Sequence, residues 1–231
     1  MSHILIVLSA ADHWTRADGS ISESGVWAEE LAEIDKALLS AGFHVDFASP
    51  AGVRPTVDKR SLDPKTVGEE VAASIRAYLD SNSGRLDKPR VLADIDVGAY
   101  DAIVVPGGHG PVEDLYRDTD MGRVLLDADR RGKVIAAVCH GPAALLAARD
   151  PSGGWPFAGR RMTAFSAEEE IEFGTAHNAP WLLAGTLRRL GARYEQGPHW
   201  EPFVVVDGHL ITGQNPASSA ALAEAVIAAL R

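Results

Sequence analysis

The stretch Val134-Ile135-Ala136-Ala137-Val138-Cys139-His140-Gly141-Pro142 decides the fold. Its first five residues are all apolar, which is typical of a parallel strand that helices cover on both faces. Gly141 permits a tight turn, Pro142 suits a first helical position, and an Ala/Leu-rich stretch follows to Ala148. The pattern predicts a strand, a sharp turn and a helix in direct succession, which is the repeating unit of an α/β fold.

Similar apolar runs recur along the chain and alternate with segments of helical period. The further expected strands are residues 4–8, 45–48, 103–105, 162–165, 204–206 and 210–211. The expected helices are residues 23–41, 67–79, 122–130, 142–148, 180–190 and 217–230. This alternation predicts an α/β protein with a flavodoxin-like, doubly wound, mostly parallel sheet and helices on both of its faces.

Length and composition indicate one domain. The chain has 231 residues, of which 46% are hydrophobic and 23% are charged, close to the average for a globular domain. Residues 54–100 are polar and interrupted by Pro and Gly, and they are too many for an ordinary strand connection. We therefore expect a single domain, residues 1–231, with a polar insertion at about residues 54–100.

Charge and apolar run length exclude several classes of partner. The net charge of −10 provides no basic surface for a phosphate backbone, so we expect no nucleic-acid partner. No apolar run approaches the length of a membrane span, and the first run is too short for a secretory signal, so we expect a cytoplasmic protein with no membrane partner. Cys139 is the single cysteine, which excludes an internal disulfide and leaves one thiol to be explained.

The position of Cys139 favours a nucleophile. A side chain on a turn between strand and helix points out of the carboxyl edge of the sheet, and the helix N-terminus favours thiolate over thiol. We therefore expect Cys139 to be a thiolate at neutral pH. The alternative interpretation is a buried core thiol, but a core cysteine requires no Gly-Pro turn after it.

His140 is the candidate acid or base beside this thiol, because an elbow can bring adjacent side chains together. The alternative is an exposed loop histidine. A third group should orient the imidazole, and the candidates are Glu168, Glu169 and Glu170, which follow the expected strand at residues 162–165. At least two of these carboxylates are expected to be the solvated acidic start of a helix.

Glu30 lies on or beside the apolar stripe of the first expected helix, with Trp27 and Ile34 as neighbours at helical spacing. Burial would raise the pKa of its carboxyl, and a protonated acid near a thiolate can transfer a proton. The alternative is a glutamate at the edge of the stripe that reaches solvent. Glu29 is displaced from the stripe and is expected to face away from the site.

Glycines follow the expected strand at residues 103–105, in the turn Gly107-Gly108-His109-Gly110. Their backbone N–H groups would suit an oxyanion hole or an anion site. The turn is neither a Walker loop nor a dinucleotide fingerprint, and the sequence has no Cys pair or His-Glu-x-x-His. We therefore predict no cofactor and no metal.

Three segments together identify a family resemblance. They are residues 106–110 (Pro-Gly-Gly-His-Gly), 137–142 (Ala-Val-Cys-His-Gly-Pro) and 212–219 (Thr-Gly-Gln-Asn-Pro-Ala-Ser-Ser). With them, and with Gly25-Val26-Trp27 leading to Glu30, the chain resembles the ThiJ/PfpI superfamily of class I glutamine-amidotransferase-like proteins. It looks most like the branch of heat-shock chaperones and glutathione-independent glyoxalases (glyoxalase III), and the resemblance extends over essentially the whole chain.

The resemblance implies roles for individual residues. Cys139 corresponds to the family nucleophile, His140 to its triad neighbour and Glu30 to the acid beside the thiolate. The acidic triad member falls among the three consecutive glutamates, where counting from Phe165 favours Glu170. The N–H groups of Gly108 and His140 correspond to the oxyanion site. The zinc ligands of some relatives lie in extra N-terminal sequence that has no counterpart here, which agrees with the expectation of no metal.

The leading hypothesis is therefore a cofactor-independent enzyme that converts methylglyoxal, or another 2-oxoaldehyde, to D-lactate or the matching 2-hydroxy acid through a hemithioacetal on Cys139. The resemblance also permits a stress-response holdase chaperone or a protein deglycase. A further alternative is an amide hydrolase of the amidotransferase type, because His199-Trp200-Glu201 has the His-x-Glu form of that superfamily. The resemblance and the insertion at about residues 54–100 also predict a homodimer.

Overall fold

The computed structural model describes residues 2–150 and 152–231, and these residues form a seven-stranded central sheet in the order β10-β11-β7-β6-β1-β4-β5. Neighbouring strands are parallel except for β10 and β11, which are antiparallel. The strands are β1 (His3–Val7), β4 (His44–Ser49), β5 (Arg90–Val91), β6 (Ala102–Val105), β7 (Val134–Val138), β10 (Val204–Asp207) and β11 (Leu210–Gly213). The predicted doubly wound, mostly parallel sheet is confirmed.

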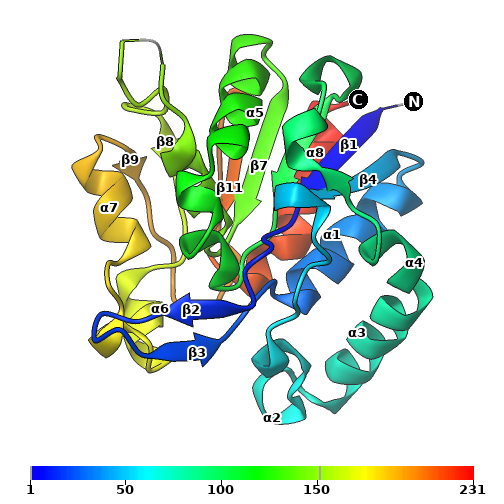
Figure 1. Ribbon diagram of the computed structural model, residues 1–231, viewed down its shortest axis with the longest axis vertical. Coiled ribbons are helices and arrows are strands. Elements are labelled where there is room, and N and C mark those ends of the chain that lie inside the picture. Colours follow the sequence, from blue (N-terminus) through cyan, green and yellow to red (C-terminus); the bar gives the residue numbers. More distant parts are fainter. Residues whose placement is uncertain (1, 151) are drawn as a thin grey trace.

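Helices cover both faces of the sheet (Figure 1). On one face α1 (Ala28–Ser40) packs against α8 (Ser219–Ala229), and both share a core with Ile4 and Ile6 of β1. On the other face α5 (Thr119–Arg130) and α7 (Leu183–Arg189) share a core with Leu5 and Val7. Alternate residues of a strand point to opposite faces, and both faces here are buried, so the strands are apolar without interruption.

The chain leaves β1 toward β4 and β5 on one side and later returns to β6, β7 and β11 on the other. This reversal places the topological switch between β1 and β6, where open α/β sheets bind their ligands at the carboxyl ends of the strands. The N-terminal end of α1 and the loops that follow β6 and β7 all meet at this edge.

The polar segment predicted as an insertion contains α2 (Pro64–Val67), α3 (Glu69–Ser81) and α4 (Ser83–Leu86), and it also supplies the edge strand β5. It is fixed to α1 by a buried carboxylate. Asp35 accepts hydrogen bonds from Arg85 at 2.7 and 3.0 Å and from the Tyr78 hydroxyl at 2.8 Å. The domain organisation itself stays a prediction.

Two expected elements differ from the structure. Residues 162–165 contribute only to β8 (Arg161–Met162), which pairs with β9 (Arg193–Tyr194) in a separate two-stranded sheet. The segment after the cysteine turn is a 3₁₀ helix, Gly141–Ala147, instead of an α-helix. The end of this segment packs closely against α5, where a Cβ on Gly122 would lie only 2.4 Å from Ala147 O.

The first expected helix also starts later than predicted. A hairpin of β2 (His13–Thr15) and β3 (Ile21–Glu23) precedes it, and Val26 then bridges to Val57, so α1 begins only at Ala28. The hairpin lies beside the end of the molecule that carries α6 (Ala167–Glu172) (Figure 1). Its turn is tied to the segment after α6 by the Ala17 N–H, which donates to Asn178 O at 2.9 Å.

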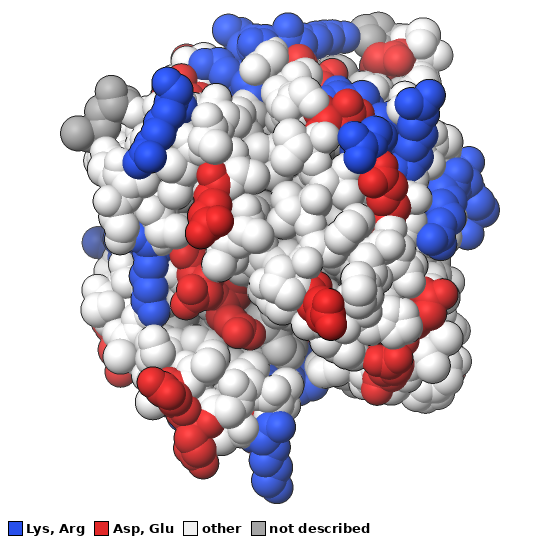
Figure 2. All heavy atoms as spheres, turned by 180° about the vertical axis from the view of Figure 1, so that it is seen from behind, with Lys and Arg blue, Asp and Glu red and all other residues white. Residues whose placement is uncertain are grey.

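Among the described residues, no helix combines the length and apolar character that a membrane span requires. On the face that Figure 2 shows, Lys and Arg side chains gather along the upper edge, whereas Asp and Glu are scattered over the rest.

Candidate active site

Cys139 occupies a strained turn at the carboxyl end of β7. Its φ of 59° lies in the left-handed region, which is uncommon for a residue other than glycine. The turn is held on both sides, because the Cys139 N–H donates to Gly213 O at 3.0 Å and the Phe165 N–H donates to Cys139 O at 2.8 Å. Strained residues of this kind cluster at functional sites, where the surrounding structure holds them in place.

Backbone N–H groups of Gly108 and His140 are directed at the Cys139 sulfur. Gly108 has a φ of 85°, and a Cβ there would lie 2.2 Å from Gly25 O, so only glycine fits the position. The two N–H groups predicted as an oxyanion site therefore converge on the reacting atom.

Glu30 is fully buried next to Cys139. Its Oε2 accepts a hydrogen bond of 2.6 Å from the Gly107 N–H. Its Oε1 has no hydrogen-bond partner among the described residues, and the carboxyl group interacts with the Cys139 thiol. Burial raises the pKa of Glu30 to about 8, so the carboxyl keeps its proton at neutral pH.

His140 and Glu170 complete a hydrogen-bonded chain that leads away from the sulfur. His140 Nδ1 lies 3.4 Å from Cys139 Sγ, and His140 Nε2 lies 2.7 Å from Glu170 Oε2. An ionised Glu170 can only accept, so Nε2 carries the proton and Nδ1 is free to take the proton of the thiol. Burial alone would raise the pKa of Glu170, but the charges and hydrogen bonds of two imidazoles hold it well below its usual range.

The structure separates the three consecutive glutamates. Glu169 forms a capping box with Ser166 at the start of α6. Glu168 accepts a hydrogen bond from Gln196 at the surface. Glu170 points inward to His140. The three adjacent carboxylates of one helical turn face different directions, and the one that faces His140 is Glu170, which counting from Phe165 favoured.

The surroundings of Cys139 disfavour the thiolate that was expected at neutral pH. Burial raises the pKa of Cys139 well above its ordinary value, and the Glu30 carboxyl adds to this effect, while the N–H groups of Gly108 and His140 act in the opposite direction. The helix expected to favour the thiolate is only a short 3₁₀ segment. The prediction of a free thiolate at rest is therefore wrong, because these surroundings favour the neutral thiol.

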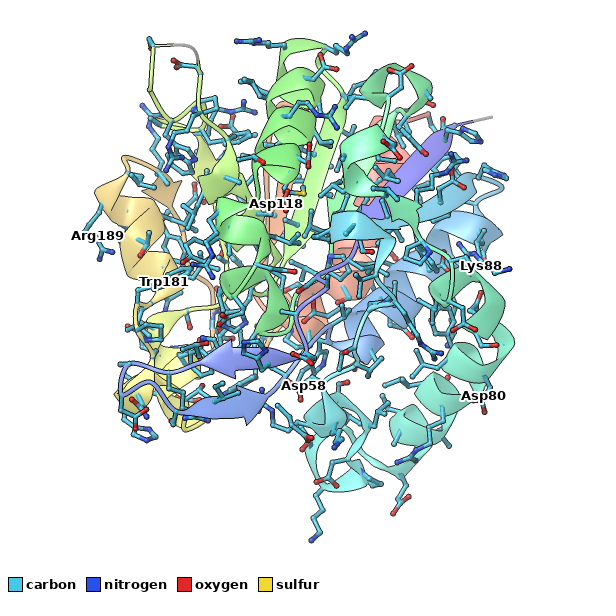
Figure 3. The ribbon with its side chains drawn as sticks, in the orientation of Figure 1. Asp58, Asp80, Lys88, Asp118, Trp181 and Arg189 are labelled. Atoms are coloured by element: carbon cyan, nitrogen blue, oxygen red, sulfur yellow. The ribbon has the colours of Figure 1, made fainter. Side chains whose placement is uncertain are left out.

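His109 and Arg60 form a second chain of contacts, which was not predicted from the sequence. Arg60 donates to His109 Nδ1 at 3.2 Å, so His109 Nε2 carries the proton that is donated to Glu170 Oε1 at 2.9 Å. Arg60 is held in turn by the buried Asp58, which lies between the β2–β3 hairpin and α2 (Figure 3). The only indication in the sequence was the position of His109 within its glycine turn.

The cysteine lies at the base of a cavity of about 390 Å³. Cys139, His140, His109 and Gly108 form its polar end. The rest is mainly apolar and aromatic, and is lined by Trp27, Phe165, Phe173, Trp200, Val67, Pro216 and Ala217, with Thr66 and Glu29. Pockets of this size and composition bind small organic molecules.

Glu29 was expected to face away from the site, and the structure contradicts this. Glu29 lines the cavity and its carboxylate accepts a hydrogen bond of 3.3 Å from Trp27 Nε1. Helical spacing displaced Glu29 from the apolar stripe, but the cavity extends past the edge of the stripe and includes it. His199 bonds to Glu172 at the surface, 2.8 Å from its Oε1, and does not line the cavity.

His109, His140 and Glu170 have the chemistry of metal ligands, and their ligand atoms lie within 4.8 Å of one another. These atoms are already joined by two hydrogen bonds, and the Arg60 guanidinium lies close to His109. A cation would break both bonds and face that positive charge. The residues therefore fit a hydrogen-bonded chain better than a metal centre, and the absence of a metal stays a prediction.

Comparison with known proteins agrees with this geometry. Glyoxalase 3 of Candida albicans is 28% identical over 99% of this chain and 98% of its own, and glutathione-independent glyoxalase HSP31 of Saccharomyces cerevisiae is 27% identical with the same coverage. Among solved structures, the Francisella tularensis Rapid Encystment Protein superposes over 100% of both chains with a TM-score of 0.90 and 28% identity. Glyoxalase III of Candida albicans superposes over 99% of this chain and 97% of that one, with a TM-score of 0.82 and 27% identity.

The family is shown by a profile match that spans most of the chain. The profile of the DJ-1/PfpI family matches residues 21–229, which include every element that contributes to the cavity. The resemblance stated from the sequence motifs is thereby confirmed, and the chain belongs to the DJ-1/PfpI family.

Proposed function

We propose that this protein is a glutathione-independent glyoxalase that converts methylglyoxal to D-lactate. One observation carries the proposal: the sulfur of Cys139 lies at the base of an apolar cavity, between a buried carboxyl that keeps its proton and an imidazole oriented by a carboxylate. Two full-length relatives named as glyoxalases support it.

The reaction begins with addition of sulfur to the aldehyde. His140 Nδ1 takes the proton of the Cys139 thiol, and Glu170 stabilises the imidazolium that forms. A bond forms between sulfur and the aldehyde carbon, and the carbonyl electron pair moves to oxygen. The N–H groups of Gly108 and His140 stabilise this oxyanion. The imidazolium then returns its proton to the oxygen, which leaves a neutral hemithioacetal and a neutral His140.

Isomerisation then moves hydrogen from the first carbon to the second. His140 takes the proton from the former aldehyde carbon while Glu30 protonates the ketone oxygen, which gives an enediol. His140 next protonates the second carbon, and Glu30 recovers a proton from the oxygen of the first, which gives a thioester. Water hydrolyses the thioester, releases lactate and restores the thiol. One carbon is oxidised and its neighbour is reduced, so the steps need no external oxidant or reductant.

Cys139→Ser tests the proposal. The variant should lose methylglyoxal consumption and lactate formation by at least about 1,000-fold, since removal of a nucleophile leaves only binding and oxyanion stabilisation. The assay follows methylglyoxal loss together with D-lactate and L-lactate, and far-UV circular dichroism checks the fold. Retention of D-lactate formation by the folded variant would refute the assignment of Cys139.

The same variant separates the other candidate functions. A holdase that binds exposed apolar segments should suppress aggregation of a client protein equally well without the thiol. A deglycase would depend on Cys139, as the glyoxalase does, but would release adducts already formed on a protein. An amide hydrolase dependent on His199 has no support from the site, because that side chain lies outside the cavity.

A further inference from the structure

The cavity above Cys139 is larger than methylglyoxal requires. Methylglyoxal has only a methyl group beyond its two carbonyl carbons, whereas a volume of about 390 Å³ lies within the range of sites for much larger organic ligands. An apolar volume that the substrate leaves unfilled contributes nothing to its affinity. The part of the cavity beyond the sulfur is therefore able to bind a further chemical group of a larger substrate.

Four aromatic side chains, Trp27, Phe165, Phe173 and Trp200, form this part of the cavity and are called the aromatic wall below. Their rings support one another by edge contacts. Trp27 and Phe173 have ring centroids 6.0 Å apart at 73°, and Phe165 and Trp200 are 5.6 Å apart at 68°. Such contacts fix the ring positions before a ligand arrives, which lowers the entropic cost of binding.

Two polar groups hold the aromatic wall, Arg60 from outside the cavity and Glu29 from within its lining. The Arg60 guanidinium lies 4.9 Å from the ring centroid of Phe173, and the Trp27 indole N–H donates to Glu29. Arg60 also contacts His109, so the same side chain supports both the wall and the chain of hydrogen bonds to Glu170.

Trp200 is part of the aromatic wall although its backbone conformation is unfavourable for tryptophan. Its φ of 61° is in the left-handed region, and its side chain is still 41% exposed. The Trp200 N–H donates to Glu169 Oε1 at 2.8 Å, and its indole N–H donates to Glu172 Oε2 at 2.6 Å. A strained backbone and two hydrogen bonds to α6 thus place a large apolar ring at the mouth of the cavity, where burial of the ring does not account for its position.

The charge of the lining constrains the ligand further. Among the described residues that line the cavity there is no Lys or Arg, and Glu29 is the acidic residue in its wall. A carboxylate or phosphate on the substrate would lose its hydration with no cation to replace it. The cavity therefore favours an uncharged group.

We propose that the preferred substrates are 2-oxoaldehydes whose ketone carbon carries a flat, uncharged apolar group, as in phenylglyoxal, with that group on the aromatic wall and the aldehyde at Cys139. This inference rests on the proposed glyoxalase function and specifies its substrate class. Trp200 is the specificity-determining residue for the apolar group.

The test compares kcat/KM for phenylglyoxal, 4-carboxyphenylglyoxal and methylglyoxal, as initial rates in short assays, because phenylglyoxal also modifies arginine. The wild-type protein should favour phenylglyoxal over methylglyoxal by at least about tenfold, the scale on which one apolar group in a fitted pocket discriminates. The carboxylated analogue, which has the same ring, should be poorer than phenylglyoxal by a similar factor.

Trp200→Gly removes the ring but adopts the left-handed conformation without strain, so the loop can keep its path. It should lower the ratio of phenylglyoxal to methylglyoxal kcat/KM by at least about tenfold, and Trp200→Phe should restore much of it. Ile171→Ala is the matched control, because this apolar side chain is also exposed, at 64%, lies on α6 and does not line the cavity. It should change neither rate.

The outcomes separate this inference from the function on which it rests. If the wild-type protein turns over neither aldehyde, or Cys139→Ser retains both activities, the glyoxalase proposal fails. If Cys139-dependent turnover of methylglyoxal is present but phenylglyoxal is no better, or Trp200→Gly leaves the ratio unchanged, only the inference about the aromatic wall is overturned. Equal rates with the carboxylated analogue would overturn its requirement for an uncharged group.

Discussion

Glu30→Gln should lower activity and raise stability at the same time. The glutamine keeps the shape of the side chain, and its carbonyl oxygen can still accept the hydrogen bond from the Gly107 N–H that Glu30 Oε2 now receives at 2.6 Å. It cannot donate and recover a proton. In the mechanism proposed above, Glu30 does this between the two oxygens of the substrate, so kcat for methylglyoxal should fall by about 100-fold or more.

The stability effect follows from the buried carboxyl. Burial raises its pKa from the ordinary 4.5 to about 8, so over this interval the unfolded chain ionises Glu30 while the folded protein keeps the proton. The folded state then binds more protons than the unfolded state, and the free energy of unfolding falls as pH rises. At about 1.4 kcal/mol per pH unit, the wild-type protein loses up to about 5 kcal/mol from this group between pH 4.5 and pH 8. Above pH 8 the loss is complete.

Urea unfolding at pH 5, 6, 7 and 8 measures this difference. The stability of Glu30→Gln relative to wild type should increase steadily with pH, because other groups titrate equally in both proteins and cancel. Repeating the pair in a Cys139→Ser background separates the proton of the carboxyl from that of the thiol. Glu33→Gln, an exposed change on the same helix, should affect neither activity nor the pH slope. A constant stability difference across this pH range, or an unchanged kcat, would refute the assignment of Glu30 as a buried, protonated acid.

Three further predictions concern other parts of the molecule. Asp35→Ala leaves Arg85 and the Tyr78 hydroxyl without their buried acceptor, so the free energy of unfolding measured in urea should fall by roughly 2 to 4 kcal/mol. This is somewhat less than for a fully buried ion pair, because Arg85 is partly exposed. A loss below about 1 kcal/mol would contradict this. His109→Leu removes one of the two N–H donors that hold the pKa of Glu170 low, so the acid limb of the kcat/KM profile should move to higher pH, and an unmoved limb would show that His109 does not act on Glu170. The predicted homodimer should scatter light with twice the mass of the 24.5 kDa chain, and a monomer mass would disprove it.

What could be predicted from the sequence was local. The apolar strand, the cysteine turn and the Gly-Pro sequence after it are neighbours in the chain, so their geometry follows from short-range rules. The placement of Glu30 near the core also follows from helical spacing alone. Its contact with the sulfur required the resemblance as well, because the helix and the cysteine turn are far apart in the sequence.

What could not be predicted depends on distant contacts. Arg60 reaches His109 from a segment that reads only as a polar insertion, and no periodic pattern connects the two. The ionisation of Cys139 depends on the balance between burial and two backbone donors, which a turn motif does not reveal. Trp200 has a left-handed backbone conformation, which the sequence would have indicated only if a glycine stood at this position.

Three features of the site share one property, which is that each is energetically unfavourable on its own. Cys139 and Trp200 are strained at φ values of 59° and 61°, and Glu30 is a carboxyl buried without a full set of partners. Each strained backbone costs about 1 to 3 kcal/mol. Cys139 and Trp200 line the same cavity, and Glu30 is buried behind it against Cys139. The sheet is covered on both faces by apolar cores that can bear this cost. Substitutions that relieve it at the cavity should therefore stabilise the fold and reduce catalysis, whereas equally conservative changes in the two cores should destabilise the fold without changing the catalytic groups.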